Sequence, residues 1–167
     1  SPEKRKFGWI EQPDSPENPW KLHPIGDTYP DMLIGVVLAD INSDGNPDVM
    51  IGTYSGSPRD RDGEDKTVND RMGRIVWFEH PGDPAGQWIR HDISRRLRGM
   101  FDQFVPIDLD KDGDIDFVST RGNSFPYDGV FWLEQVRTIT PTRRFIPARD
   151  VESREMGLPT VVMEDGG

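Results

Sequence analysis

Short apolar runs alternate along this chain with clusters of Gly, Pro, Asp and Asn. The first group of four runs spans residues 34–40, 48–53, 73–79 and 88–93. A second group keeps the same order at 103–108, 116–120, 129–135 and, in degenerate form, 143–147. Runs of this length bounded by turn formers are typical of antiparallel β-strands. The 15 prolines, spread over the whole chain, argue against long helices.

The two groups are copies of one repeat. Trp9 and Trp77 are separated by the same interval in the sequence as Asp40 and Asp108. A weaker third copy begins at Trp132, which follows Trp77 at a shorter interval. A fixed offset shared by several landmarks indicates a repeat architecture, in which each unit packs against its neighbours.

Four-stranded antiparallel units in tandem predict an all-β fold of β-propeller blades. We expect a single segment over 1–167, divided into a partial blade 1–30, a blade 31–98 with a polar insertion at 57–69, a blade 99–148, and the start of a further blade at 149–167 with a strand at 158–163. Propellers close with about 4–8 blades. The ring is therefore incomplete, and the chain is expected to belong to a longer polypeptide or to a homo-oligomeric ring. An open stack or a small sandwich is the alternative.

Two acidic segments join the first and second strands of the two units. Both fit the pattern D-x-[DN]-x-D-G-x-x-D. Their oxygen-bearing residues at positions 1, 3, 5, 7 and 9 are Asp40, Asn42, Asp44, Asn46 and Asp48 in the first, and Asp108, Asp110, Asp112, Asp114 and Asp116 in the second. Ca²⁺ prefers 6–8 oxygen ligands, and Gly at position 6 permits the sharp turn that makes them converge. The sequence therefore predicts two calcium sites.

Charge supports this prediction. The two segments carry −3 and −4, which is −7 of the net −10 of the chain. Like charges this concentrated are costly unless a cation neutralises them. The EF-hand is excluded because position 12 holds Ile51 and Ser119 instead of Glu, and because the flanking elements are predicted strands.

The pattern resembles the FG-GAP or VCBS-type repeat family. The resemblance rests on the apolar strand 36–40, the acidic loop, the strand 48–52 ending in Gly, and the aromatic strand around Trp77, and it covers about residues 9 to 136. It implies a calcium-stabilised β-propeller. Members include integrin α-subunit heads, fungal lectins, and propeller domains of carbohydrate-active lyases and dehydratases, so the family defines fold and metal better than function.

Two functions follow as expectations. The first is an extracellular, cell-surface or periplasmic calcium-binding module that recognises carbohydrate or protein; the second is the propeller domain of a carbohydrate-active enzyme. A purely structural scaffold is a third possibility. Sites of Kd about 10⁻⁴–10⁻³ M suit extracellular modules. The acidic surface disfavours nucleic acid, no run approaches the length of a membrane span, and no catalytic residue is assigned.

Other recurring residues have simpler interpretations. The repeated tryptophans are expected to pack between blades, although aromatic rings also stack on sugars. His23 and His91 recur at one position and predict a structural hydrogen bond. A small basic cluster contains Arg95, Arg96 and Arg98, and Arg121 and Asn123 follow the second strand of the next unit. These polar residues are expected to lie in solvated loops, with contact to an acidic sugar as the alternative. Residues 60–65 are acidic enough to suggest an irregular third calcium loop, but Val68 stands where the position-9 acid belongs, which argues against it.

Overall fold

The computed structural model describes residues 6–56, 66–140 and 152–160. Over these ranges the chain forms nine strands and no helix. The strands are β1 (Lys6–Glu11), β2 (Lys21–Asp27), β3 (Met32–Ala39), β4 (Asp48–Tyr54), β5 (Gly73–Glu79), β6 (Ile89–Arg96), β7 (Phe104–Ile107), β8 (Asp116–Arg121) and β9 (Gly129–Leu133). Accordingly, none of these ranges holds a helix long and apolar enough to cross a membrane.

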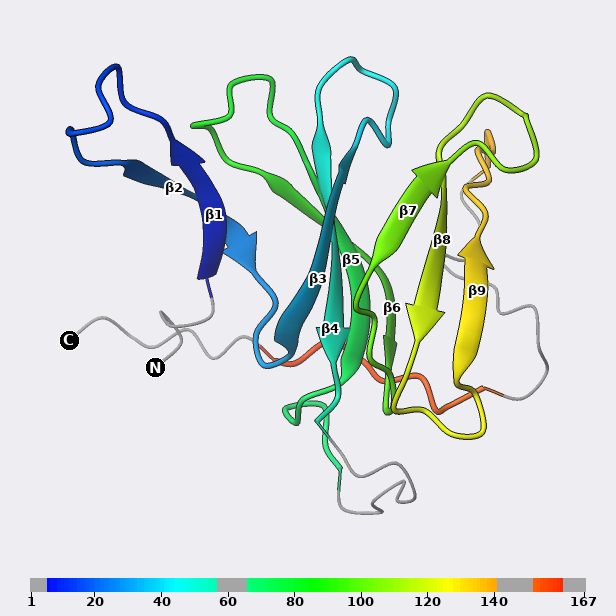
Figure 1. Cartoon of the computed structure of the whole chain (residues 1–167). Helices are drawn as coiled ribbons and strands as arrows, with labels where there is room; N and C mark the ends of the chain where they lie inside the picture. Colours follow the sequence, from blue (N-terminus) through cyan, green and yellow to red (C-terminus); the bar gives the residue numbers. More distant parts are fainter. Residues whose placement is uncertain (1–5, 57–65, 141–151, 161–167) are drawn as a thin grey trace.

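The strands form three antiparallel sheets in chain order: β1-β2, β3-β4-β5-β6 and β7-β8-β9. Figure 1 shows the three sheets side by side, with the four-stranded sheet in the middle. The prediction of an all-β fold of antiparallel strands is confirmed. None of the three sheets closes on itself.

The predicted strands that fall in the described ranges are found, within a few residues at each end, with one exception. The strand predicted at 158–163 is wrong over residues 158–160, which form no strand. The chain just before them is held instead by Arg95, whose Nη1 donates to Gly157 O at 2.6 Å and whose backbone carbonyl accepts from Met156 N at 2.7 Å. Residues 161–163 and the degenerate strand at 143–147 lie outside the described ranges.

The two central strands of the middle sheet, β4 and β5, are buried on both faces. Because side chains alternate along a strand, Val49 and Ile51 pack in one cluster with Phe7 of the first sheet. Met50, which lies between them on β4, faces the other way and packs in a cluster with Phe104 of the third sheet. The three sheets are thus stacked through two apolar layers.

The third sheet leaves one apolar face uncovered. Its front face, which we define by Val105, Val130 and Trp132, is exposed by 49%, 74% and 43% respectively. Val130 occupies the repeat position of Ile75, which is 2% exposed because the third sheet covers it. The same positions are therefore apolar in both sheets, and among the described residues only the second sheet has a neighbour over them.

Candidate metal centre

The two acidic segments form matching loops at one end of the sheets (Figure 1). Loop 1 (residues 40–48) joins β3 to β4, and loop 2 (residues 108–116) joins β7 to β8. Both leave the first strand of a sheet and enter the second, so the repeat places their carboxylates in equivalent positions. We call this end of the molecule the acid end.

The aspartate at position 9 anchors each loop. Asp48 is fully buried; its Oδ2 accepts the backbone N–H of Ile41 at 2.9 Å, and its Oδ1 accepts that of His80 at 2.8 Å. Burial raises the pKa of Asp48, and these N–H donors oppose the rise. The carboxylate therefore ties the start of the loop to the residue that follows β5.

Asp116 makes the same two connections in loop 2. Its Oδ2 accepts the N–H of Leu109 at 3.1 Å, and its Oδ1 accepts that of Gln135 at 2.9 Å. The sequence pattern predicts Asp48 and Asp116 only as metal ligands and gives no sign of this anchoring role. Their ligation of a metal stays a prediction.

Both loops also share one backbone conformation. At position 4, Ser43 and Lys111 have φ of 62° and 68°; at position 6, Gly45 and Gly113 have φ of 89° and 99°. Positive φ is the region that favours Gly, which explains the residue at position 6. The resulting curl turns the short polar side chains of each loop inward.

The first carboxylate of each loop accepts the N–H of its glycine. Gly45 N donates to Asp40 Oδ2 at 2.9 Å, and Gly113 N donates to Asp108 Oδ2 at 3.3 Å. At position 5, Asp112 Oδ1 accepts Asp114 N at 3.0 Å, and loop 1 repeats this bond at 2.8 Å. Equivalent bonds at several positions show that the loops are one structure used twice.

In loop 2 three of the five predicted ligands come together. One carboxylate oxygen from each of Asp108, Asp110 and Asp112 lies within 4.8 Å of the others. Desolvation raises the pKa of Asp110, and the neighbouring carboxylates of Asp112, Asp116 and Asp108 add to the rise. The protein therefore gathers negative charge here at an electrostatic cost.

Two oxygens of loop 2 are buried without a hydrogen-bond donor. They are Oδ1 of Asp108 and Oδ1 of Asp114, and Asp114 as a residue is only 7% exposed. A buried carboxylate oxygen without a donor is costly, and a hard cation satisfies it. The donor set and these two oxygens fit a calcium ion.

Loop 1 satisfies more of its own groups. The amide Nδ2 of Asn42 donates to Asp44 Oδ2 at 3.1 Å and to Glu79 Oε1 at 3.3 Å. The pKa of Asp44 is lowered, mainly by the N–H of Asn46 and also by the Asn42 amide. Asn42 at position 3 of loop 1 thus supplies a hydrogen-bond donor where loop 2 has the repelling carboxylate of Asp110.

The recurring histidines have a structural partner. His91 Nε2 lies 2.7 Å from Glu79 Oε2, and its ring stacks on Trp77 with centroids 4.2 Å apart. The preceding copy of the repeat has the same geometry, with His23 Nε2 at 2.7 Å from Glu11 Oε2. The predicted structural hydrogen bond is confirmed. Glu11 and Glu79 recur at the repeat offset, which is the sequence signal that identifies them as partners.

The repeated tryptophans are divided between packing and exposure. The indole N–H groups of Trp9 and Trp88 both donate to Pro84 O, at 3.0 and 3.2 Å, which joins the first sheet to the second. Packing between sheets is confirmed for Trp88, which lies in the cluster with Phe7 of the first sheet, whereas its repeat counterpart Trp20 is 55% exposed. Trp132, in contrast, lies on the uncovered front face.

The expectation of a solvated basic loop is wrong. Five arginines at the end of the sheets opposite the loops are at most 8% exposed: Arg74, Arg95, Arg96, Arg98 and Arg121. We call this the arginine end. Arg95 donates from Nε and Nη2 to the two carboxylate oxygens of Asp31 at 2.8 and 2.9 Å. The cluster is buried because Asp31, on the turn before β3, supplies a matched carboxylate.

The C-terminal described segment covers the rest of the arginine end. Arg121 Nη1 pairs with Glu152, and its Nη2 donates to Ser153 Oγ at 3.2 Å. Arg96 Nη1 donates to Ser153 O at 2.8 Å. In Figure 1 this segment, coloured orange-red, passes beneath the second and third sheets. Arg95 and Arg121 are therefore engaged inside the protein rather than presented to an acidic sugar.

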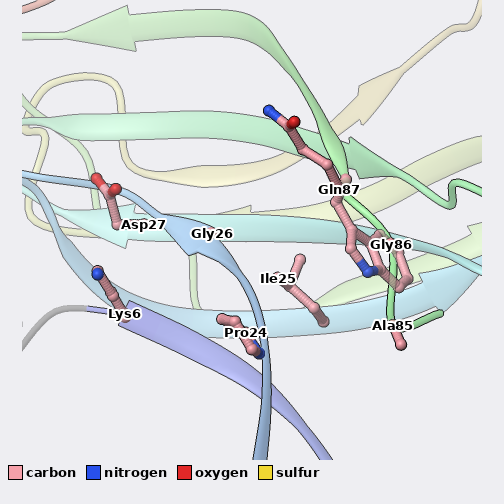
Figure 2. A pocket seen from close by; sticks show the side chains of 9 residues that line it. Lys6, Pro24, Ile25, Gly26, Asp27, Ala85, Gly86 and Gln87 are labelled. Atoms are coloured by element: carbon pink, nitrogen blue, oxygen red, sulfur yellow. The ribbon is translucent and has the colours of Figure 1, made fainter.

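A shallow cleft lies between the first sheet and the turn before β6. Figure 2 shows its lining from β2 on one side and that turn on the other. The lining residues are Lys6, Pro24, Ile25, Gly26, Asp27, Ala85, Gly86, Gln87 and Trp88. This lining offers no pairing of a nucleophile with a general base, so it does not define a catalytic site.

No family model matches the chain, and no curated protein or solved structure was found to match it. The site is therefore interpreted from its own geometry. The possible third calcium loop at 60–65 lies outside the described residues.

Proposed function

We propose that this chain is a calcium-binding module built from propeller-type β-repeats. The observation that carries the proposal is the pair of buried, donor-free carboxylate oxygens of Asp108 and Asp114 in loop 2. Loop 1 shares its backbone with loop 2, including positive φ at positions 4 and 6, which extends the proposal to two sites.

The ion would be held by the side-chain oxygens at positions 1, 3 and 5, and at position 7 by the backbone carbonyl and, in loop 2, by the donor-free Oδ1 of Asp114. The position-9 aspartate, already bonded to backbone N–H groups, would complete the shell directly or through water. Calcium supplies the positive charge that clustered carboxylates lack. Its proposed role is structural, because it would hold the turn between two adjacent strands, with water completing its shell.

The recognition function proposed with it is binding of a carbohydrate or protein outside the cell, at the cell surface or in the periplasm. The alternatives of a propeller domain in a carbohydrate-active enzyme and of a pure scaffold remain proposals of lower rank. No observation favours the enzyme, since Arg95 and Arg121 are engaged in internal ion pairs.

The propeller architecture is likewise proposed. Two observations support it. The sheets follow one another in chain order, and the front face of the third sheet is apolar at the positions that, in the second sheet, are covered by the third. The stack would continue with a further sheet of the same kind, from a longer chain or from a copy of this one.

The direct test is calorimetric titration with CaCl₂, paired with thermal unfolding in calcium and in chelator. We expect two ions per chain. At 100 times Kd each ion stabilises the fold by about 2.7 kcal/mol, which for two sites raises Tm by roughly 10–20 °C.

The matched control is Asp83→Asn, which removes an exposed carboxylate outside both loops, on the turn before β6. It is expected to bind two ions as the parent chain does, whereas Asp112→Ala is expected to bind one. Absence of binding heat together with an unchanged Tm in the parent chain would refute the proposed function.

A further inference from the structure

Arg137 lies between the two acidic loops. It follows β9, and its Nη2 donates to the carbonyl of Ile41 at 3.0 Å and to Ser43 Oγ at 2.9 Å, both in loop 1. Its Nε lies 3.4 Å from Asp114 Oδ2 in loop 2. One guanidinium therefore contacts two loops that belong to different copies of the repeat.

The contacted groups control the shape of each loop. Ile41 is the residue whose N–H is held by the anchoring Asp48, and Ser43 is the position-4 residue with φ of 62°. Asp114 is the buried position-7 residue whose other oxygen, Oδ1, has no hydrogen-bond donor. Fixing one loop therefore restrains the guanidinium that touches the other.

We propose that Arg137 is a positioning residue that couples the two loops, so that a calcium ion in one raises the calcium affinity of the other. The inference rests on the proposed function, since it requires both loops to bind. Its physical basis is ordering. A calcium ion that fixes Asp114 also restrains the Arg137 side chain, so part of the conformational entropy that loop 1 loses on binding has already been lost.

The geometry requires arginine. The planar guanidinium directs Nη2 toward loop 1 while Nε faces loop 2, and Gln135 Oε1, which accepts from Nε at 3.1 Å, helps to hold the plane. A lysine ammonium is a point charge without this fork. Arg137→Lys therefore keeps the charge near both loops and removes the simultaneous contacts.

The solvent exposure of Arg137 limits the strength of the coupling. The Arg137 side chain is 46% exposed, so solvent weakens its ion pair with Asp114. We therefore expect a coupling at or below the lower end of common factors, about two- to fivefold in affinity. Linkage requires the same factor in both directions, which gives the experiment an internal check.

The experiment is a calorimetric cycle on the full chain at fixed ionic strength. The calcium affinity of loop 1 is measured in the parent chain and in Asp112→Ala, which disables loop 2. The calcium affinity of loop 2 is measured in the parent chain and in Asp44→Ala, which disables loop 1. Each measurement is repeated with Arg137→Lys. The matched control is Arg71→Lys, an exposed arginine just before β5 at the opposite end of the sheets.

With Arg137 or in the Arg71→Lys control, loss of one site should weaken the other about two- to fivefold. With Arg137→Lys, each site should bind with the same affinity whether or not its neighbour is intact. A second readout is hydrogen exchange in Asp44→Ala: calcium at loop 2 should slow exchange of loop 1 amides such as Gly45 only when Arg137 is present.

Two different failures are distinguishable. If two ions bind independently of each other both in the parent chain and in Arg137→Lys, the coupling is overturned and the proposed function still stands. A parent chain that binds no calcium would overturn the proposed function and the coupling with it.

Discussion

The two ends of the sheets treat charge in opposite ways. At the arginine end, Arg74 and Arg95 are buried around Asp31, whose Oδ2 lies 2.7 and 2.8 Å from their Nε atoms. Burial lowers the pKa of Arg74, and the charges of Asp31 and Asp92 oppose that effect. At the acid end, carboxylates gather and receive mainly backbone N–H donors. The arginine end carries its counter-charges in the chain, whereas under the proposed function the acid end takes them from solution.

Removal of Asp31 tests this contrast and is expected to give the largest change in the free energy of unfolding. Asp31→Ala leaves two buried guanidinium groups without their shared carboxylate, and the loss of one partner of a buried ion pair costs about 3–5 kcal/mol. Urea unfolding in excess calcium measures the change. The milder Asp31→Asn keeps the shape and should show the same direction, with the exposed Asp102→Asn as control. A loss below about 1 kcal/mol, the level of exposed pairs, would mean that solvent compensates the arginines and that the contrast is false.

The second test asks whether calcium acts on one end only. Removing calcium should withdraw about 2.7 kcal/mol per site that had been filled at 100 times Kd. We expect hydrogen exchange in chelator to accelerate first at the loop amides of Gly45 and Gly113, and least at the arginine end, for example at Met72, whose N–H donates to Asp31 at 2.7 Å. Uniform acceleration at both ends would contradict the comparison.

The structure of the acid end can be predicted from the sequence more completely than that of the arginine end. The loops are predictable because each is a continuous segment whose pattern specifies its own turn. The anchoring bonds of Asp48 to His80 and of Asp116 to Gln135 are not, because they join positions 32 and 19 residues apart. Their donors are backbone N–H groups, which leave no mark on the residue type.

The arginine end is mispredicted for a physical reason. A run such as 95–98 is polar in composition, and polar loops are usually exposed. Its burial depends on Asp31, which lies 64 residues from Arg95, and on the segment around Ser153. Neither partner shares the repeat offset, so no local or periodic signal connects them. The strand misplaced at 158–160 has the same origin, since Arg95 holds the chain just before it.

The third test sharpens the comparison within the acid end. Loop 2 carries the buried donor-free oxygens, whereas loop 1 satisfies Asp44 through the Asn42 amide. Asp112→Ala should therefore remove a larger share of the calcium-induced rise in Tm than Asp44→Ala. Differential scanning calorimetry with and without calcium measures both shares. An equal or reversed order would show that the amide at position 3 does not lessen the dependence on calcium.

The smallest effect is expected at position 3 of the loops, which is Asp110 in loop 2. The pKa of Asp110 is raised above its ordinary value of 3.8 in the folded chain, first by desolvation and then by its neighbours. A raised pKa means that the protonated group favours folding; this contribution is complete below pH 3.8 and is lost as the pH rises through the folded pKa. In calcium-depleted buffer at neutral pH, Asp110→Asn should therefore raise Tm slightly, and the gain should vanish as the pH falls toward the unfolded pKa.

The reciprocal change is the control for that small effect. Asn42→Asp places a carboxylate beside Asp44 and removes the donor that reaches Asp44 and Glu79, so it should lower Tm without calcium and make loop 1 resemble loop 2. Tm measured over a pH series in calcium-depleted buffer compares the two variants. If both substitutions move Tm in the same direction, the charge at position 3 is not what separates the loops, and the difference lies elsewhere, with position 7 (Asn46 against Asp114) and position 4 (Ser43 against Lys111) the next to test.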